Sequence, residues 1–167
     1  DGEGDNLSSS ISIFKNNEIT KISENSSFYS LGYLYSQVTA YLGLKPFEHE
    51  FKVMGMAPYG NKKDVARIYD KIKHLLKLNE NGTFDSSVVS NLFKYEISKY
   101  FINEKFQNIC GAIQKMTENL IIDWVSFWIK KTSIKNIIVS GGVFMNIKAC
   151  KELLDLNAVS SLFVVPS

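Results

Sequence analysis

The sequence predicts an α/β fold with a mixed sheet and flanking helices, and three observations support this class. The chain closes on a βαβ pattern, in which the β-branched run NIIVS leads into Gly141-Gly142, a helical segment and the strand-like LFVV. Alternating residues near the start predict a β-hairpin. Between these ends, apolar residues recur at helical spacing. The length of 167 residues suits one domain or a large piece of one.

The predicted hairpin comes first in the chain. Ile11 and Ile13 share one face of the segment from Ser8 to Phe14, and EITKI continues the alternation after Asn16-Asn17. Asparagine pairs of this kind favour tight hairpin turns.

Three helices are predicted between the hairpin and the closing unit. The first has Ser30 as N-cap and Gly43 as its stop, and its apolar face is Leu31, Leu34, Tyr35, Val38, Tyr41 and Leu42. The second carries Val65, Ile68, Tyr69, Ile72, Leu75 and Leu76. A turn at residues 79–83 follows, and the pattern to about residue 100 is ambiguous. The third runs over about residues 104–131 as a central, well-buried helix with Ile109, Ile113, Met116, Leu120 and Trp124.

Composition and charge exclude several classes of function. The net charge is only +2 and the basic residues are scattered, so no nucleic-acid partner is expected. No stretch approaches the roughly 18–20 apolar residues of a membrane span. Cys110 and Cys150 lie far apart without zinc-ligand spacing, which indicates buried thiols in a cytoplasmic protein. The opening DGEGDN does not resemble a signal peptide, and we expect the chain to be an excised segment of a longer polypeptide.

The segment SGGVFMN is the first candidate site. Two glycines between a strand and a helix let backbone N–H groups approach an anion, and the helix N-terminus adds the positive end of its dipole. Asn146 can add a side-chain amide from the first helical turn. This pattern is compatible with phosphate or nucleotide binding, and equally with a tight connection. It is not a Walker loop.

Two further segments each allow two interpretations. The carboxylates of DGEGD can hold a divalent metal beside a nucleotide, but the same residues also form plain exposed turns. EFKVMGMAPYG, at residues 50–60, is either a buried crossover or a wall of a ligand site. Lys52 can neutralise a phosphate or extend to water, and Gly55 can admit a flat ligand or merely shape the turn. His49 and His74 are solitary and predict no catalytic base.

Taken in this order, DGEGD, SLGYLYSQVTAYLG, EFKVMGMAPYG and NIIVSGGVFMN resemble the O-carbamoyltransferase family of antibiotic- and nodulation-factor-modifying enzymes. The resemblance implies a Kae1-like domain, akin to the universal tRNA-threonylcarbamoyl transferase component, with a partial actin-like (ASKHA) fold. Residues 1–167 would then be a fragment of one such domain, with the hairpin and helices at 1–131 and the βαβ unit at 134–167.

The resemblance also implies a reaction. A separate YrdC-like domain would make carbamoyl-adenylate from carbamoyl phosphate and ATP, and the domain resembled here would pass the carbamoyl group to a hydroxylated small molecule. A divalent metal, iron in the family, would lie beside the phosphate. The implied site residues are Asp1 as metal ligand, Gly141, Gly142 and Asn146 on the phosphate side, and Gly32, Tyr33 and Ser36 at the ribose. Lys52 and Glu50 match strongly patterned positions, but their roles are inferred from charge, and a nucleotide-binding role for Gly55 is inferred from its size.

The chain also departs from the family pattern. It starts after the family's HxxxH metal pair and stops before a glycine-rich acidic loop, so we expect the fragment to be inactive alone. No general base is identifiable. Two alternatives remain open, namely a sugar-kinase-like phosphotransferase of the same superfamily and a non-catalytic nucleotide-binding module.

Overall fold

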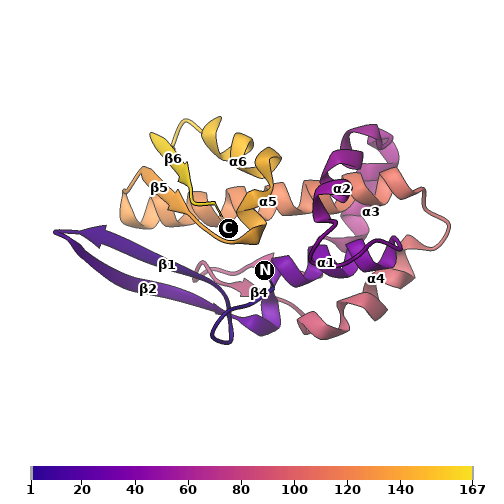
Figure 1. Cartoon of the computed structure of the whole chain (residues 1–167), viewed down its shortest axis with the longest axis horizontal. Coiled ribbons are helices and arrows are strands. Elements are labelled where there is room, and N and C mark those ends of the chain that lie inside the picture. Colours follow the sequence, from indigo (N-terminus) through magenta and orange to yellow (C-terminus); the bar gives the residue numbers. More distant parts are fainter. Residues whose placement is uncertain (1, 167) are drawn as a thin grey trace.

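The computed structural model describes residues 2–166, apart from the side chain of residue 91. A 27-residue helix, α5 (Phe106–Thr132), runs along most of the molecule, and most of the other helices, including the one in the closing βαβ unit, lie against it (Figure 1). Its predicted apolar positions are all buried. At about 1.5 Å per residue the helix is about 40 Å long, which lets it support both ends of the fold.

The predicted hairpin is confirmed as β1 (Leu7–Lys15) paired antiparallel with β2 (Glu18–Ser26). Asn16 and Asn17 form the connection with φ of 54° and 62°, and two consecutive left-handed residues define the turn that fits the twist of a hairpin. The hairpin extends away from the helices (Figure 1). Its tip is exposed, including the facing pair Phe14 and Ile19.

The first predicted helix is confirmed as α1 (Leu31–Tyr41), which follows a short 3₁₀ turn, η1 (Ser27–Tyr29). Ser30 caps it by accepting a hydrogen bond from the Tyr33 N–H at 3.1 Å. Gly43 ends it in the left-handed conformation, with φ of 76°. The predicted cap and stop are both correct.

The 50–60 segment forms α2 (Glu50–Met56) and the 3₁₀ turn η2 (Ala57–Tyr59). Val53 is fully buried against the core, which anchors the helix. Pro58 lies in the first positions of η2 and ends the α-helical pattern, since it lacks a backbone donor. Gly55 has a low helix propensity, but the burial of Val53 outweighs this local preference.

Helix α3 (Lys62–Ile72) follows, and it is shorter than its apolar pattern predicts. Leu75 and Leu76 are fully buried but lie beyond its end, where the Leu75 N–H bonds to the Ile72 carbonyl and the chain turns into strand β3 (Lys77–Leu78). Strand β4 (Phe84–Asp85) pairs with β3 across the predicted turn. The ambiguous stretch contains η3 (Ser90–Leu92) and α4 (Phe93–Phe101), whose Phe93, Ile97 and Phe101 enter the core.

Gly60, the last residue of the 50–60 segment, permits close packing of η2 on α5. A Cβ there would lie 2.7 Å from Val65 Cγ2 and 2.9 Å from the Gln107 carbonyl oxygen. A Cβ at Gly55 would meet nothing within 4 Å. The two glycines of one segment therefore have different physical roles.

We expect Gly60→Ala to lower the free energy of unfolding by about 1–3 kcal/mol, because a backbone oxygen cannot yield to the added methyl group. Gly55→Ala, in an open helical position, should raise it by up to about 1 kcal/mol. Urea denaturation followed by circular dichroism measures both. Equal effects from the two substitutions would contradict this assignment.

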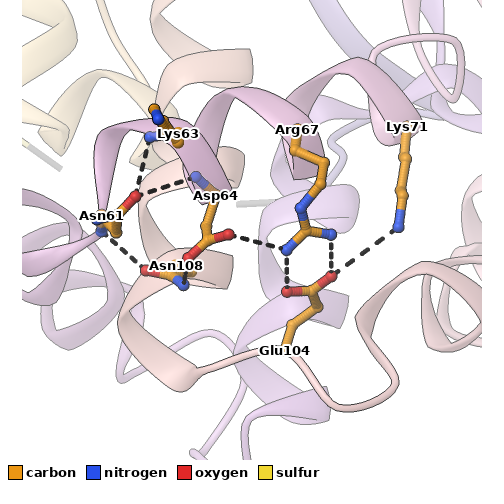
Figure 2. Close-up of polar contacts among 7 residues, drawn as sticks. All are labelled: Asn61, Lys63, Asp64, Arg67, Lys71, Glu104 and Asn108. Carbon is orange, nitrogen blue, oxygen red and sulfur yellow. Dashed lines mark hydrogen bonds and ion pairs between the residues drawn. The ribbon is translucent and has the colours of Figure 1, made fainter.

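A polar cluster joins α3 to the start of α5 (Figure 2). Asn61 caps α3, and its backbone N–H donates to Asn108 Oδ1 at 2.8 Å. Arg67 makes two hydrogen bonds to the Glu104 carboxylate, at 2.5 and 2.7 Å, and a third to Asp64 at 3.2 Å. The Glu104 side chain is only 10% exposed and the Arg67 side chain is 46% exposed, so only the carboxylate of this bidentate pair is largely shielded from water.

The hydrogen bonds from Arg67 lower the pKa of Glu104 below its usual value. A carboxyl whose pKa is depressed in the folded state stabilises the protein above its unfolded pKa, and this contribution is lost as the pH falls through the folded pKa. We therefore expect Glu104→Gln to lower the melting temperature by a few degrees at pH 7, with the difference from the wild type shrinking as the pH falls below about 4 and through the folded pKa. Glu24→Gln, in the exposed Lys21–Glu24 pair, should have little effect at either pH.

The closing βαβ pattern is confirmed. Strand β5 (Asn136–Val139) pairs in parallel with β6 (Ser161–Val164), and α6 (Ile147–Leu154) connects them and buries Ala149, Cys150 and Leu153. The strands of residues 2–166 do not join into the predicted mixed sheet, because they form three separate two-stranded sheets. Strands β3 and β4 are too short to extend a sheet, and the hairpin strands are largely exposed. The α/β class is therefore correct, with small sheets in place of one larger sheet.

Candidate functional site

One pocket, of about 310 Å³, lies between α1, α2 and the SGGVFMN segment. These stretches are distant in sequence, but α1 and α2 both pack on α5, and the 3₁₀ turn η4 (Gly142–Met145) contacts α1. Apolar walls with a few polar groups are typical of small-molecule sites. The lining residues are Leu31, Gly32, Tyr35 and Ser36 of α1, Phe47, Glu48, Glu50, Phe51 and Met54 in and before α2, Thr117 of α5, and Gly142, Val143, Met145 and Asn146.

Four of the residues implied by the resemblance meet in this lining, namely Gly32, Ser36, Gly142 and Asn146. They come from two separate segments, and the 50–60 segment supplies a third wall. The structure therefore brings together SLGYLYSQVTAYLG, EFKVMGMAPYG and SGGVFMN. Whether these residues bind a nucleotide stays a prediction.

Lys52 and Gly55 lie outside the lining, although their helix contributes to it. Successive helical residues are rotated by about 100°, so Glu50 and Met54 share the pocket face while Val53 faces the core. Lys52 is exposed, and its ammonium lies 5.8 Å from the centre of the Phe51 ring. The predicted contact between Lys52 and a phosphate has no geometric support in this arrangement.

Tyr33 and Gly141 also lie outside the lining. The Tyr33 ring closes over Gly2, where an added Cβ would come within 2.7 Å of it, and meets Phe47 edge-on at 5.7 Å between ring centres. Gly141 has φ of 102°, a conformation that L-residues rarely adopt, and it turns the chain out of β5. Tyr33 thus lies behind the pocket wall, and Gly141 sets the turn that precedes it.

Ser36 is a buried polar residue in this lining. It belongs to α1 and is 1% exposed. Among the described residues, its hydroxyl oxygen is the one buried side-chain polar atom without a hydrogen-bond partner. Because this oxygen has almost no accessible surface, a ligand in the pocket could bond to it only after the serine side chain rotates toward the ligand.

Asn146 lies just before α6, not in its first turn as predicted, because η4 separates the glycines from the helix. Its Oδ1 caps α6 by accepting from the Ala149 N–H at 3.2 Å. Its amide also pairs reciprocally with Gln114, through two hydrogen bonds of 2.9 Å. Gln114 is itself held by the Tyr35 hydroxyl at 3.0 Å and by Glu118 at 2.8 Å.

The titratable groups near the pocket favour binding over nucleophilic chemistry. Burial, followed by smaller effects of nearby Cys110, Glu50 and Glu118, raises the pKa of Tyr35 well above its usual value, so its hydroxyl remains a donor. Burial raises the pKa of the Cys110 thiol to about 12 and also raises that of Cys150. Both cysteines are free and buried, as predicted, and neither is poised as a thiolate.

The charges of the lining are acidic. Glu48 and Glu50 belong to it, and no lysine or arginine does among the described residues. Glu50 is held in place because its carboxylate accepts from the Phe47 N–H at 2.7 Å. Such a lining suits hydroxyl and N–H groups of an uncharged ligand portion, whereas a bare phosphate would be repelled.

The N-terminal turn gives a mixed result. Gly4 and Leu7 exchange two backbone hydrogen bonds of 2.9 Å around the exposed Asp5 and Asn6, which is the plain turn considered above. Asp1, predicted as a metal ligand, lies outside the described residues. Across residues 2–166 no group of three histidine, cysteine, aspartate or glutamate side chains could hold a metal ion. The described residues therefore do not form a metal site by themselves.

Several residues in or next to the pocket were not predicted from the sequence. Phe47, Phe51 and Met54 belong to the neighbourhood of the 50–60 segment, and their apolar character in partly exposed positions is the available signal. Gln114 is a polar residue within a run of buried apolar residues on α5. A polar side chain at such a position is a signal for a buried hydrogen-bond network.

Comparison with known proteins establishes the family. Residues 1–167, the whole chain, match the family model described as Carbamoyltransferase N-terminus. The chain therefore belongs to the carbamoyltransferase family and corresponds to its N-terminal part, which confirms the resemblance carried by the four motifs.

Three relatives illustrate the range of similarity. An uncharacterized protein of Synechocystis is 30% identical over all of this chain and 29% of its own length. Nodulation protein NolNO of Sinorhizobium fredii is 27% identical over 100% of this chain and 25% of its own length, and nodulation protein NolO of Bradyrhizobium diazoefficiens is 24% identical over 100% and 31%. The chain spans about a quarter to a third of these curated relatives. Within residues 2–166, no helix is both long and apolar enough to cross a membrane.

Proposed function

We propose that this chain forms the part of a longer carbamoyltransferase that holds the nucleoside portion of carbamoyl-adenylate during transfer to a hydroxylated small molecule. One observation carries the proposal. The segments that mark the family, from α1, α2 and the turn after β5, converge on one pocket of about 310 Å³. The family membership supports the carbamoyl chemistry.

The character of the pocket favours the nucleoside over the phosphate. Aromatic and thioether side chains of Phe47, Phe51 and Met54 offer contacts for a flat base, and Glu50 offers an acceptor for ribose hydroxyls. A cavity of about 310 Å³ is at the lower end of the range for small-molecule sites. The phosphate would then lie outside this lining, toward the glycine turn or a part of the protein beyond this chain.

In the proposed transfer, no pocket residue forms or breaks a covalent bond. The acceptor hydroxyl oxygen attacks the carbamoyl carbon, the bond from that carbon to the phosphate oxygen breaks, and AMP leaves. The hydroxyl proton goes to a base that the described residues do not identify. The role of this chain is to fix the adenylate so that the carbamoyl carbon is held at one place relative to the acceptor.

The reaction is tested in the complete protein with ATP, carbamoyl phosphate and hydroxylated acceptors. We expect pyrophosphate release that depends on carbamoyl phosphate, and AMP release that also depends on the acceptor. Production of ADP and a phosphorylated acceptor without carbamoyl phosphate would instead identify a sugar-kinase-like phosphotransferase. Nucleotide binding without turnover would identify a non-catalytic module.

The pocket is tested by Ser36→Ala. Removing an unpaired buried hydroxyl should leave the free energy of unfolding unchanged or raise it by up to about 1 kcal/mol. The same change should weaken AMP binding about fivefold to tenfold by calorimetry, because in this proposal the hydroxyl rotates toward the bound nucleoside and its hydrogen bond there is lost. Ser98→Ala removes an exposed hydroxyl that bonds to the Tyr95 carbonyl and serves as the control. Unchanged AMP affinity in Ser36→Ala would place the nucleoside elsewhere.

A further inference from the structure

The side chains of Glu118, Gln114 and Asn146 form a hydrogen-bonded chain that ends at the pocket. Glu118 is half-buried on α5, Gln114 is 3% exposed one turn earlier, and Asn146 lines the pocket. Gln114 Nε2 donates to Glu118 Oε1 at 2.8 Å and to Asn146 Oδ1 at 2.9 Å. Gln114 Oε1 accepts from Asn146 Nδ2 at 2.9 Å and from the Tyr35 hydroxyl at 3.0 Å.

The two ends of this chain have fixed polarity. The Glu118 carboxylate can only accept, so the nitrogen of the Gln114 amide must face it. At the other end the Ala149 N–H can only donate, so the oxygen of the Asn146 amide must face that group. One arrangement of the two amides satisfies both ends, and it is the arrangement observed.

This arrangement determines what Asn146 can offer to a ligand. Its Oδ1 already accepts two hydrogen bonds, from Gln114 and Ala149, which occupies both lone pairs. One of its two Nδ2 protons goes to Gln114. The remaining capacity is a single N–H donor.

We infer that Gln114 is a positioning residue which, oriented by Glu118, makes Asn146 present a hydrogen-bond donor to an acceptor atom of the nucleoside in this pocket. The inference rests on the proposed function, since it specifies how that site recognises its ligand. Gln114 itself is absent from the pocket lining and acts through Asn146. An acceptor atom in this sense is a ribose oxygen or a ring nitrogen of the base.

The test is a double-mutant cycle on AMP affinity in the complete protein. Gln114→Met and Asn146→Ala should each weaken AMP binding about tenfold by calorimetry, the effect of one lost hydrogen bond. The double variant should be no weaker than Asn146→Ala alone, because Gln114 acts only through Asn146. A double variant weakened about a hundredfold would show independent roles and overturn the inference, as would wild-type affinity in Gln114→Met.

Variants of Glu118 keep the test decisive if Gln114→Met fails to fold. Glu118→Gln retains an oxygen that accepts from Gln114, so AMP affinity should stay within about twofold of the wild type. Glu118→Leu removes the acceptor and should weaken binding severalfold. Equal affinity in both variants would overturn the orienting role of Glu118.

A measurement without ligand separates this inference from the proposed function. In ¹⁵N-labelled protein, Gln114→Met should shift the side-chain amide resonances of Asn146, whereas Ser98→Ala should leave them unchanged. If the wild type fails to bind AMP, the proposed nucleoside site fails and the assigned ligand fails with it. If AMP binds to the wild type and Asn146→Ala weakens that binding, but Gln114→Met leaves the Asn146 side-chain resonances unchanged, only the positioning role of Gln114 is overturned.

Discussion

Gly82→Ala is expected to lower the free energy of unfolding by about 2–4 kcal/mol. Gly82 has φ of 79°, and a Cβ on it would lie 2.2 Å from Phe127 Cε1. The substitution therefore adds left-handed backbone strain and a steric overlap with an aromatic ring. Moving the turn would also disturb the Gly82 carbonyl oxygen. This oxygen accepts hydrogen bonds from the indole N–H groups of Trp124 and Trp128, at 3.1 Å each.

Gly43→Ala is the matched control for Gly82→Ala. Gly43 has nearly the same φ, 76°, but a Cβ there would meet nothing within 4 Å. Gly43→Ala should therefore lower the free energy of unfolding by about 1–2 kcal/mol, through backbone strain alone. Urea denaturation measures both, and the two tryptophans of the chain report directly on the Gly82 turn by fluorescence. Equal losses from the two substitutions would show that the packing of Phe127 contributes nothing.

The elements predicted correctly are those whose boundaries depend on neighbouring residues. The Asn16-Asn17 turn, the Ser30 cap and the Gly43 stop depend only on residues a few positions away in the sequence. Their positions can therefore be predicted from a single sequence. The central helix was predictable because its apolar repeat is long. The closing βαβ unit combined a strand, a glycine turn and a helix in a fixed order.

The errors have a common physical origin in tertiary packing. Helix α2 forms despite Gly55 because Val53 is buried against the core. Helix α4 gave an ambiguous pattern, yet Phe93 and Phe101 are fully buried in it. Neither contact is encoded within the segment itself, so local preference alone could not decide these regions.

The sequence predicted which segments form the candidate site better than it predicted which of their residues line it. EFKVMGMAPYG serves both of the roles considered for it, since Val53 and Gly60 pack inward while Glu50, Phe51 and Met54 face the pocket. Lys52 was singled out by its charge, but the rotation of the helix directs it to solvent. Gln114 has no motif, because its significance depends on the side chains that surround it in space.

Asn146→Asp is expected to weaken AMP binding about a hundredfold and to lower the free energy of unfolding by about 2–3 kcal/mol at pH 7. The introduced carboxylate can still accept from Gln114 and the Ala149 N–H. It cannot donate, so one of its oxygens would face Gln114 Oε1, 2.9 Å from the present nitrogen, without a proton between them. It would also place a negative charge in a pocket that already holds Glu48 and Glu50.

The pH dependence of this variant separates its two losses. Protonating the introduced carboxyl supplies one O–H, so the stability difference from the wild type should shrink as the pH falls from 7 to about 4. AMP affinity should recover only in part, to about tenfold below the wild type, because protonation removes the added charge but its single proton bonds to Gln114 and leaves no donor for the ligand. Asn136→Asp adds the same charge at an exposed site that accepts from Ser161 Oγ at 2.9 Å, and it should change neither quantity appreciably. Full recovery of both stability and affinity in acid would show that the ligand does not require the second N–H of Asn146.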